Sequence, residues 1–385
     1  MLFNNQNYLH GRLVGIGKIR KDGSREFRFL EKPINNMILR CGLNEFMTYN
    51  GSNSATSVPG FGTKEPWSII EYCGFGTSGA ANDFANTNTL ASPTITPYST
   101  REQRNWPFVG IYCGNNGQDD FYKIRISHLS PAVTEAVSVR EIGYFKSYNS
   151  NYYLFSRIVL PSIFYLVAGD KLITTYELVV SNARTPLDVE NCGLHDSNDV
   201  QLDCQVSERI TYGEKSCWVN YPENNNSGWA SGSYGSGTPY LHAPHAFYSY
   251  PSSGSSGIAQ SNFTLRYTKS PFNFPTTSDV TLQYRTRYDS DHCTNQATVY
   301  TPDSFKRDVI VNVPAYWPEM TLATGYRDLY AINWGTLFVR FGHFDSNMNF
   351  TPAPWRKLAS RTAKFVFRQS IATQDSIAWQ QSQQP

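Results

Sequence analysis

The sequence predicts an all-β fold of two antiparallel β-sandwich domains, jelly-roll-like, with long loops and little helix. The first observation is an alternation with period two between residues 167 and 180. Leu172, Tyr176 and Leu178 fall on one side of an extended chain, and Thr175 and Glu177 fall on the other. The second is composition, because 25 Tyr and 23 Phe favour strands. The third is the regular alternation of short apolar segments with turn clusters, which is typical of sandwiches and barrels.

The N-terminal residues 1–34 are expected to form a hairpin or arm ahead of the first sandwich. Asp22-Gly23 is a strong signal for the hairpin turn. The basic run 18–28 is interpreted as a solvated hairpin rather than a phosphate contact. Residues 34–47 are the best helix candidate, since their apolar side chains are spaced for one face, although Gly42 weakens the prediction.

The first sandwich domain is expected to span residues 35–183. Its strands alternate in hydrophobicity, with Tyr122, Ile124 and Ile126 opposing the basic and polar residues between them. The stretch 167–180 opens on a polar turn at 168–171, and the strand that follows the turn is predicted to be half-buried. The predicted strands are 121–127, 136–145, 153–160 and the segment that ends at Val180.

The second sandwich domain is expected to span residues 184–375, after a polar junction at 181–186 in which Pro186 breaks the strand. A Gly/Ser/Tyr-rich loop region covers 224–257, and the C-terminal tail 376–385 is expected to fray or to order against a partner. The predicted strands are 262–268, 279–288, 307–313, 336–341 and 363–368.

Charge and cysteine content exclude several classes of protein. The net charge of +2 lacks the basic stripe that nucleic-acid binding requires, so we expect no nucleic-acid partner. The seven cysteines are odd in number, widely spaced and without a C-x-x-C pair, which indicates thiols rather than a disulfide framework or zinc site. No signal peptide is recognisable, and the longest apolar run, 158–169, is too short to span a membrane.

No segment carries a convincing catalytic, cofactor or metal pattern, so we expect a protein that is not an enzyme and binds no cofactor or metal. His242 and His245 flank a proline in a Gly/Ser-rich loop, which argues against zinc. The Asp119-Asp120 pair is interpreted as part of a turn. Two further groups are also interpreted as turns or loops: Asp289, Asp291, His292 and Cys293, and the glycines Gly74, Gly76 and Gly79.

Aromatic residues in and before the loop region form the one candidate contact surface. Rigid rings among small polar residues suit either a sugar face or a protein contact, and the packing of the loop on itself or on a neighbouring subunit is the simpler interpretation. The candidate residues are Trp218, Trp229, Tyr234, Tyr240, Tyr248 and Tyr250.

Several segments in this order carry a family resemblance. They are NNMILRCGLN (35–44), CGFGTSGAAND (73–83), SVREIGYF (138–145), LFSRIVLP (154–161), AGDKLITTYELVV (168–180), RDVIVNV (307–313), RDLYAINWGTLFVRF (327–341) and KFVFR (364–368). The chain resembles virion structural proteins of tailed bacteriophages, of the tail or tail-fibre type, over most of 35–182 and more loosely over 305–370. Residues 190–300 depart most from that pattern.

The resemblance implies a virion component that folds in the host cytoplasm and has no active site to carry over. We therefore expect a structural protein of the tail, collar or fibre attachment. It would form a homo-oligomer, a trimer or a higher ring, and would contact other virion proteins. The alternative is a receptor-binding module that recognises a host surface glycan through the aromatic loop. A capsule-degrading enzyme is the third and weakest hypothesis, because long repetitive strands around a carboxylate cleft are missing.

Overall fold

The computed structural model describes residues 2–47, 70–100, 109–115, 119–148, 151–183, 187–208, 265–271, 289–290, 296–318, 324–334 and 337–383. Within these ranges the chain is mostly strand, which confirms the predicted all-β fold class. Two short helices are described, α1 (Arg40–Met47) and α4 (Gln374–Ser382). Neither is long and apolar enough to cross a membrane.

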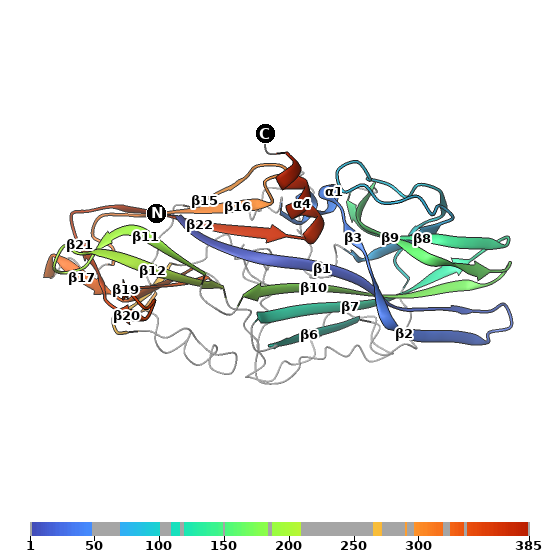
Figure 1. Ribbon diagram of the computed structural model, residues 1–385, viewed down its shortest axis with the longest axis horizontal. Coiled ribbons are helices and arrows are strands. Elements are labelled where there is room, and N and C mark those ends of the chain that lie inside the picture. The colour runs from blue at the N-terminus through green and yellow to red at the C-terminus, as the bar shows by residue number, and fades with distance from the viewer. Residues whose placement is uncertain are drawn as a thin grey trace, which may run out of the picture.

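The largest sheet runs along the long axis of the molecule (Figure 1). Its eight described strands are, in spatial order, β15 (Gln296–Tyr300), β16 (Lys306–Val313), β22 (Ala363–Ala372), β1 (Leu2–Ile19), β10 (Lys171–Ala183), β7 (Asp119–Ala132) and β6 (Val109–Asn115), with β2 (Arg25–Asn35) paired to β1. All pairings are antiparallel except that of β1 with β22.

Three smaller sheets accompany it in the described residues. A five-stranded sheet has the order β3 (Met37–Ile38), β9 (Asn151–Leu166), β8 (Val137–Tyr148), β4 (Tyr72–Gly76) and β5 (Pro93–Tyr98). A seven-stranded sheet has the order β11 (Leu187–His195), β12 (Gln201–Glu208), β19 (Leu337–Phe344), β18 (Ala331–Trp334), β13 (Arg266–Thr268) and β14 (Asp289–Ser290), with β20 (Phe350–Pro352) paired to β19. Strands β17 (Tyr326–Leu329) and β21 (Trp355–Leu358) form the last sheet.

The largest sheet contributes side chains to both main cores. In the first core, Leu13, Tyr176 and Leu178 pack with residues of the five-stranded sheet such as Phe75 and Ile142. The second core joins β16 and β22 to the seven-stranded sheet; its members include Val311, Phe365, Phe367, Val206, Val339 and Phe341. The N-terminal residues form the expected hairpin of β1 and β2, and β1 itself lies between β22 and β10 in the largest sheet.

Strand β10 differs from its predicted half-buried state. Tyr176 and Leu178 are fully buried as expected, but Thr175 and Glu177 on the opposite face are buried as well. The reason is that side chains from neighbouring strands reach over this face. Phe27 of β2 lies over Gly15 of β1, close to Thr175. A Cβ added to Gly15 would lie 2.6 Å from the Phe27 ring and 3.2 Å from the Thr175 side chain. The alternation located the strand correctly but could not reveal what covers its polar face.

The predicted helix is shorter than expected, because residues 34–35 and 37–38 are strand and the helix begins only at Arg40. Gly42 weakens intrinsic helix propensity, yet it has a packing role. A Cβ at this position would lie 2.2 Å from the carbonyl oxygen of Phe155, so only glycine lets α1 approach β9 this closely. At the other terminus, the tail that was expected to fray or to order against a partner forms α4 as far as Ser382, and a capping box between Thr373 and Ser376 begins the helix.

Candidate functional site

The aromatic contact candidates cannot be placed, because all six, Trp218, Trp229, Tyr234, Tyr240, Tyr248 and Tyr250, lie outside the described residues. His242, His245, Asp291, His292 and Cys293 also lie outside them, and Asp289 begins the short strand β14. Within the described ranges, no group of three or more His, Cys, Asp or Glu side chains could hold a metal ion.

Two interpretations of turns and loops need correction. Asp119 and Asp120 begin strand β7 and pair with Ala183 and Asn182 of β10. Gly74 and Gly76 belong to strand β4 rather than to a loop. Strand β4 has β8 on one side and β5 on the other, and a Cβ on Gly76 would lie 2.1 Å from the Ser92 carbonyl oxygen. These glycines therefore allow close packing, which the sequence pattern alone could not distinguish from a loop.

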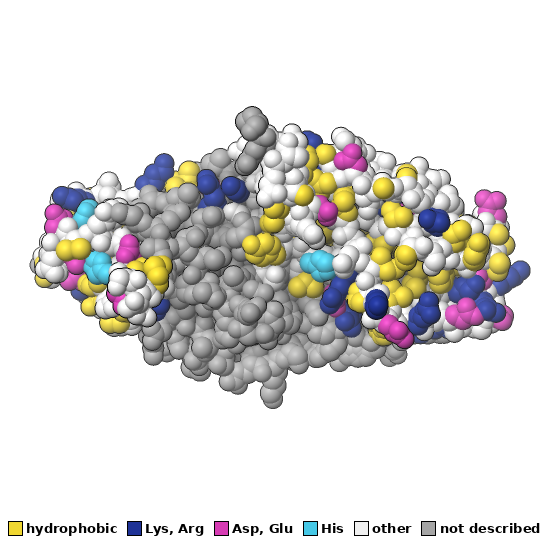
Figure 2. Space-filling model, viewed as in Figure 1, with side chains coloured by type: hydrophobic (Ala, Val, Ile, Leu, Met, Phe, Trp, Pro, Cys, Tyr) yellow, Lys and Arg dark blue, Asp and Glu magenta, His cyan; other side chains and the backbone are white. Residues whose placement is uncertain are grey.

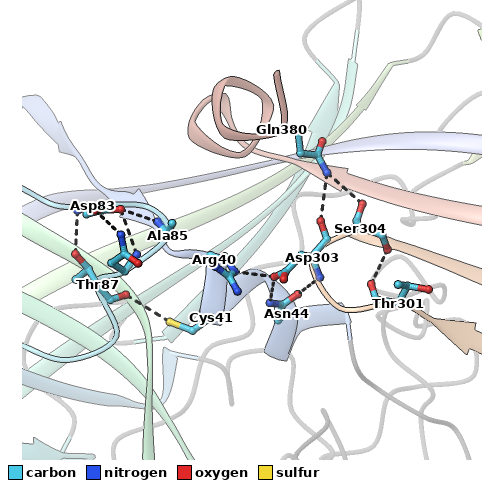
Figure 3. Close-up of polar contacts among 11 residues, drawn as sticks. Arg40, Cys41, Asn44, Asp83, Ala85, Thr87, Thr301, Asp303, Ser304 and Gln380 are labelled. Atoms are coloured by element: carbon cyan, nitrogen blue, oxygen red, sulfur yellow. Dashed lines mark hydrogen bonds and ion pairs between the residues drawn. The ribbon is translucent and has the colours of Figure 1, made fainter. Parts of the chain in front are cut away.

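One polar cluster lies where three segments distant in sequence meet, and we call it the Asp303 joint (Figure 3). The Asp303 carboxylate accepts hydrogen bonds from Arg40 Nε at 2.8 Å and Asn44 Nδ2 at 2.7 Å, both from α1. The backbone N–H of Asp303 donates to Asn44 Oδ1 at 2.9 Å. Gln380 of α4 donates to the backbone oxygens of Asp303 and Ser304. The joint thus ties the turn between β15 and β16 to both described helices.

Aromatic side chains pack under this polar cluster. The rings of Phe84, Phe305 and Trp379 form a triangle with centroid distances of 5.7 to 6.1 Å. The guanidinium carbon of Arg40 lies 5.4 Å from the Trp379 ring, a cation–π distance. Phe305 is buried although its φ is +50°, a left-handed conformation that a bulky residue adopts only when its surroundings hold it there. Trp379 therefore packs α4 onto the body of the protein, in addition to the hydrogen bonds of Gln380.

The electrostatics of the joint favour a charged carboxylate. Burial alone would raise the pKa of Asp303. The hydrogen bonds from Asn44 and Arg40, together with the positive charge of Arg40, outweigh burial and lower the pKa below its usual value. The carboxylate is thus ionised at neutral pH, and its Oδ1 accepts both hydrogen bonds from α1.

A second charged cluster fixes the loop that follows β4. Arg157 Nε donates to Glu141 Oε2 at 2.7 Å, and Nη1 donates to the carbonyl oxygen of Ala80 at 3.0 Å. Glu141 also accepts the backbone N–H groups of Ala91 and Ser92 at 3.0 and 2.7 Å. Since the Arg157 and Glu141 side chains come from adjacent strands, they anchor both ends of the loop onto the five-stranded sheet.

Other ion pairs join side chains directly opposite each other on neighbouring strands. Glu177 of β10 lies between Arg12 of β1 and Arg125 of β7 and binds both guanidiniums. Two more pairs repeat this arrangement with both carboxylate oxygens engaged, Asp308 with Arg368 and Asp328 with Arg356. Such pairs favour one register of the strands over its alternatives.

A layer of buried polar groups connects the largest sheet to the five-stranded sheet. The Tyr176 hydroxyl accepts a hydrogen bond from Asn36 at 2.7 Å and one from Ser156 at 3.2 Å. Cys73 Sγ lies 3.6 Å from Thr174 Oγ1. Burial raises the pKa of the Cys73 thiol to about 11, although hydrogen bonds to Tyr98 and Thr174 oppose the shift. Cys73 is therefore protonated at neutral pH and a poor nucleophile.

Sequence reasoning missed every one of these clusters, because their members are far apart in the chain. One structural feature is marked by a repeated sequence pattern. The triplet Asp-Ser-Asn occurs at 196–198 and again at 345–347, and each copy opens a tight turn at the same end of the seven-stranded sheet.

Comparisons with known proteins add no identification: no family model, no curated protein and no solved structure matches this chain.

Proposed function

We propose that this chain is a structural component of a bacteriophage virion, of the tail, collar or fibre-attachment kind. It acts through self-assembly and through contacts with other virion proteins. The observation that carries the proposal is that charged side chains bind segments of the chain to one another. Arg157, Glu141 and Glu177 do so as buried charges between strands, and the Asp303 joint does so between a turn and two helices. These charged groups stabilise one particular arrangement of the chain, as a scaffold requires.

Two further observations support the proposal. The segment CGFGTSGAAND, one of those that carry the resemblance to phage tail proteins, forms β4 and the loop anchored by Arg157 and Glu141. In addition, β15 and β6 end the strand order of the largest sheet within the described ranges. Sheet edges invite pairing with other chains, and a symmetric assembly is one way to cover them. We therefore propose a homo-oligomer, a trimer or a higher ring, that resides in the virion.

Sedimentation velocity of the purified protein, with a glycan array in parallel, tests this function. Reversible self-association without glycan binding is the expected result. A monomer at all concentrations that binds a defined glycan would instead support the receptor-binding alternative.

A further inference from the structure

One face of β2 presents a cationic and aromatic strip, formed by Arg25, Phe27 and Phe29. These alternate residues pair with Ile19, Gly17 and Gly15 of β1. The Arg25 guanidinium carbon lies 5.5 Å from the Phe27 ring centroid, and the two rings lie 5.2 Å apart. Phe29 is 53% exposed. Figure 2 shows Lys and Arg side chains, interspersed with Asp and Glu, around the β2 end of the molecule.

Among the described residues, the Arg25 guanidinium lacks the partner that comparable arginines have. Its Nε and Nη2 are shielded from solvent and have no hydrogen-bond partner in the part of the chain that the structure describes. In Arg356 and in Arg368, the Nε and Nη2 nitrogens donate hydrogen bonds to the two oxygens of one carboxylate, that of Asp328 and that of Asp308 respectively. Leaving such donors unsatisfied costs free energy, and a carboxylate is the matching acceptor. Arg25 is a long, partly exposed side chain, so a change of rotamer can bring its Nε and Nη2 nitrogens to the surface.

The opposite end of the molecule carries two turns of the same construction, which we call the paired turns. In one, Asp196 Oδ1 accepts the backbone N–H groups of Asn198 and Val200; in the other, Asp345 Oδ1 accepts those of Asn347 and Asn349. The fourth residues, Asp199 and Met348, have left-handed φ values of +61° and +62°.

The paired turns expose both apolar and acidic side chains. Val200 is 50% exposed and Met348 is 61% exposed. Asp345 uses its carboxylate within its turn, and Asp196 uses its carboxylate within its turn and with His343. The exposed Asp199 carboxylate makes no hydrogen bond or ion pair with any described residue.

The sequence segments that form the two surfaces are complementary in charge. Residues 18–32 contain six Lys or Arg and three Asp or Glu, whereas residues 195–203 and 343–351 contain four Asp and no Lys or Arg. The β2 hairpin and the paired turns lie at opposite ends of the long axis (Figure 1).

We propose that copies of this chain associate head to tail. In this contact the Arg25 strip of one copy binds the paired turns of the next, with the Asp199 carboxylate on the Arg25 guanidinium. Phe27 and Phe29 meet the exposed apolar side chains of the turns, which gives the aromatic and arginine composition of interface centres. A head-to-tail contact is heterologous, so it closes into a ring or continues as a filament. The inference rests on the proposed assembly function and names its two surfaces.

A charge exchange tests the contact directly. Arg25→Asp and Asp199→Arg should each prevent self-association when alone, because each variant brings like charges together. In an equimolar mixture of the two variants, an alternating arrangement joins opposite charges at every contact, so the mixture should associate again in sedimentation velocity, as open chains or as rings with an even number of subunits. The double variant in one chain should assemble as well. Arg28→Asp is the matched control, because Arg28 is exposed on the same strand but on its other face, and it should assemble like the wild type.

Asp199 needs a second variant because its backbone is left-handed. Asn tolerates that conformation as Asp does, so Asp199→Asn removes the charge without strain and should raise the Kd of association roughly tenfold or more. Unchanged assembly of the folded single variants, or failure of the double variant to assemble, would overturn the head-to-tail contact. Assembly through another surface would still leave the proposed function standing, whereas a monomeric wild type, both in solution and in particles, would remove both.

Discussion

Arg157 and Glu141 form an ion pair whose side chains are only 1% and 0% exposed, and this pair holds the loop from Thr77 to Ser92 against the five-stranded sheet. A buried charge is costly unless it is paired and hydrogen-bonded. Glu141 accepts from Arg157 and from two backbone N–H groups, so its carboxylate is well satisfied.

Replacing Arg157 by Met should lower the free energy of unfolding by about 3–5 kcal/mol, because Glu141 would remain buried without its cation. The midpoint of urea denaturation measures this effect. Arg157→Met/Glu141→Gln should recover part of the loss, since no unpaired charge remains. The exposed pair Arg20–Glu26 supplies the control, and Arg20→Ala should change the midpoint little. Equal effects of Arg157→Met and Arg20→Ala would contradict the assigned role of the buried pair.

Gly42→Ala should destabilise the protein, although the same change inside a helix normally stabilises by about 1 kcal/mol. The reason is that the new Cβ would meet the Phe155 carbonyl oxygen at 2.2 Å, and a backbone atom cannot easily move away. We expect a loss of about 1–3 kcal/mol, as for other overpacked sites, from thermal or urea unfolding. Gly79→Ala is the control, because its Cβ would meet only the end of the flexible Arg140 side chain. A stabilising Gly42→Ala would show that α1 does not pack on β9 as described.

The sequence predicted the strands well and the clusters poorly, for a physical reason. Period-two alternation reports which side chains share a face, so it located β7, β8, β16 and β22. It carries no information about which distant segment covers that face. The alternation therefore predicted that Glu177 faces solvent, whereas Arg12 and Arg125 from the two adjacent strands pair with its buried carboxylate. Likewise, Asp303 and Arg40 are separated by 263 positions, and nothing local marks them as partners.

The Asp303 joint should make stability depend on acid pH. The pKa of Asp303 is lower when folded than the usual value near 3.9, so the unfolded state binds its proton first as pH falls. The contribution is therefore fully present above about pH 5 and is lost as pH falls through the folded pKa. Asp303→Asn keeps a residue that tolerates the left-handed φ of +67° but removes the charge. Urea denaturation from pH 2 to 6 should show a shallower acid decline for this variant. Parallel curves for the two proteins would contradict the prediction.

Trp379→Ala should release α4 from the body. The substitution removes the ring contacts with Phe84 and Phe305 and the Arg40 cation–π contact. Because Trp379 is only partly buried, the loss should be smaller than the roughly 3–5 kcal/mol of a fully buried Trp. Hydrogen exchange should show loss of protection in residues 374–382 while the sheets stay protected. Ile377→Ala, at an exposed position of the same helix, should leave the protection unchanged.

Antibody-labelled electron microscopy of purified virions that carry this chain tests the central claim most directly. The proposed structural role predicts that the label sits at a fixed, repeated position on the tail, collar or fibre attachment and remains there after high-salt washing. It also predicts that a particle assembled without the chain lacks that feature. Unlabelled, structurally complete virions, with the protein recovered only from the soluble lysate, would contradict the proposed function.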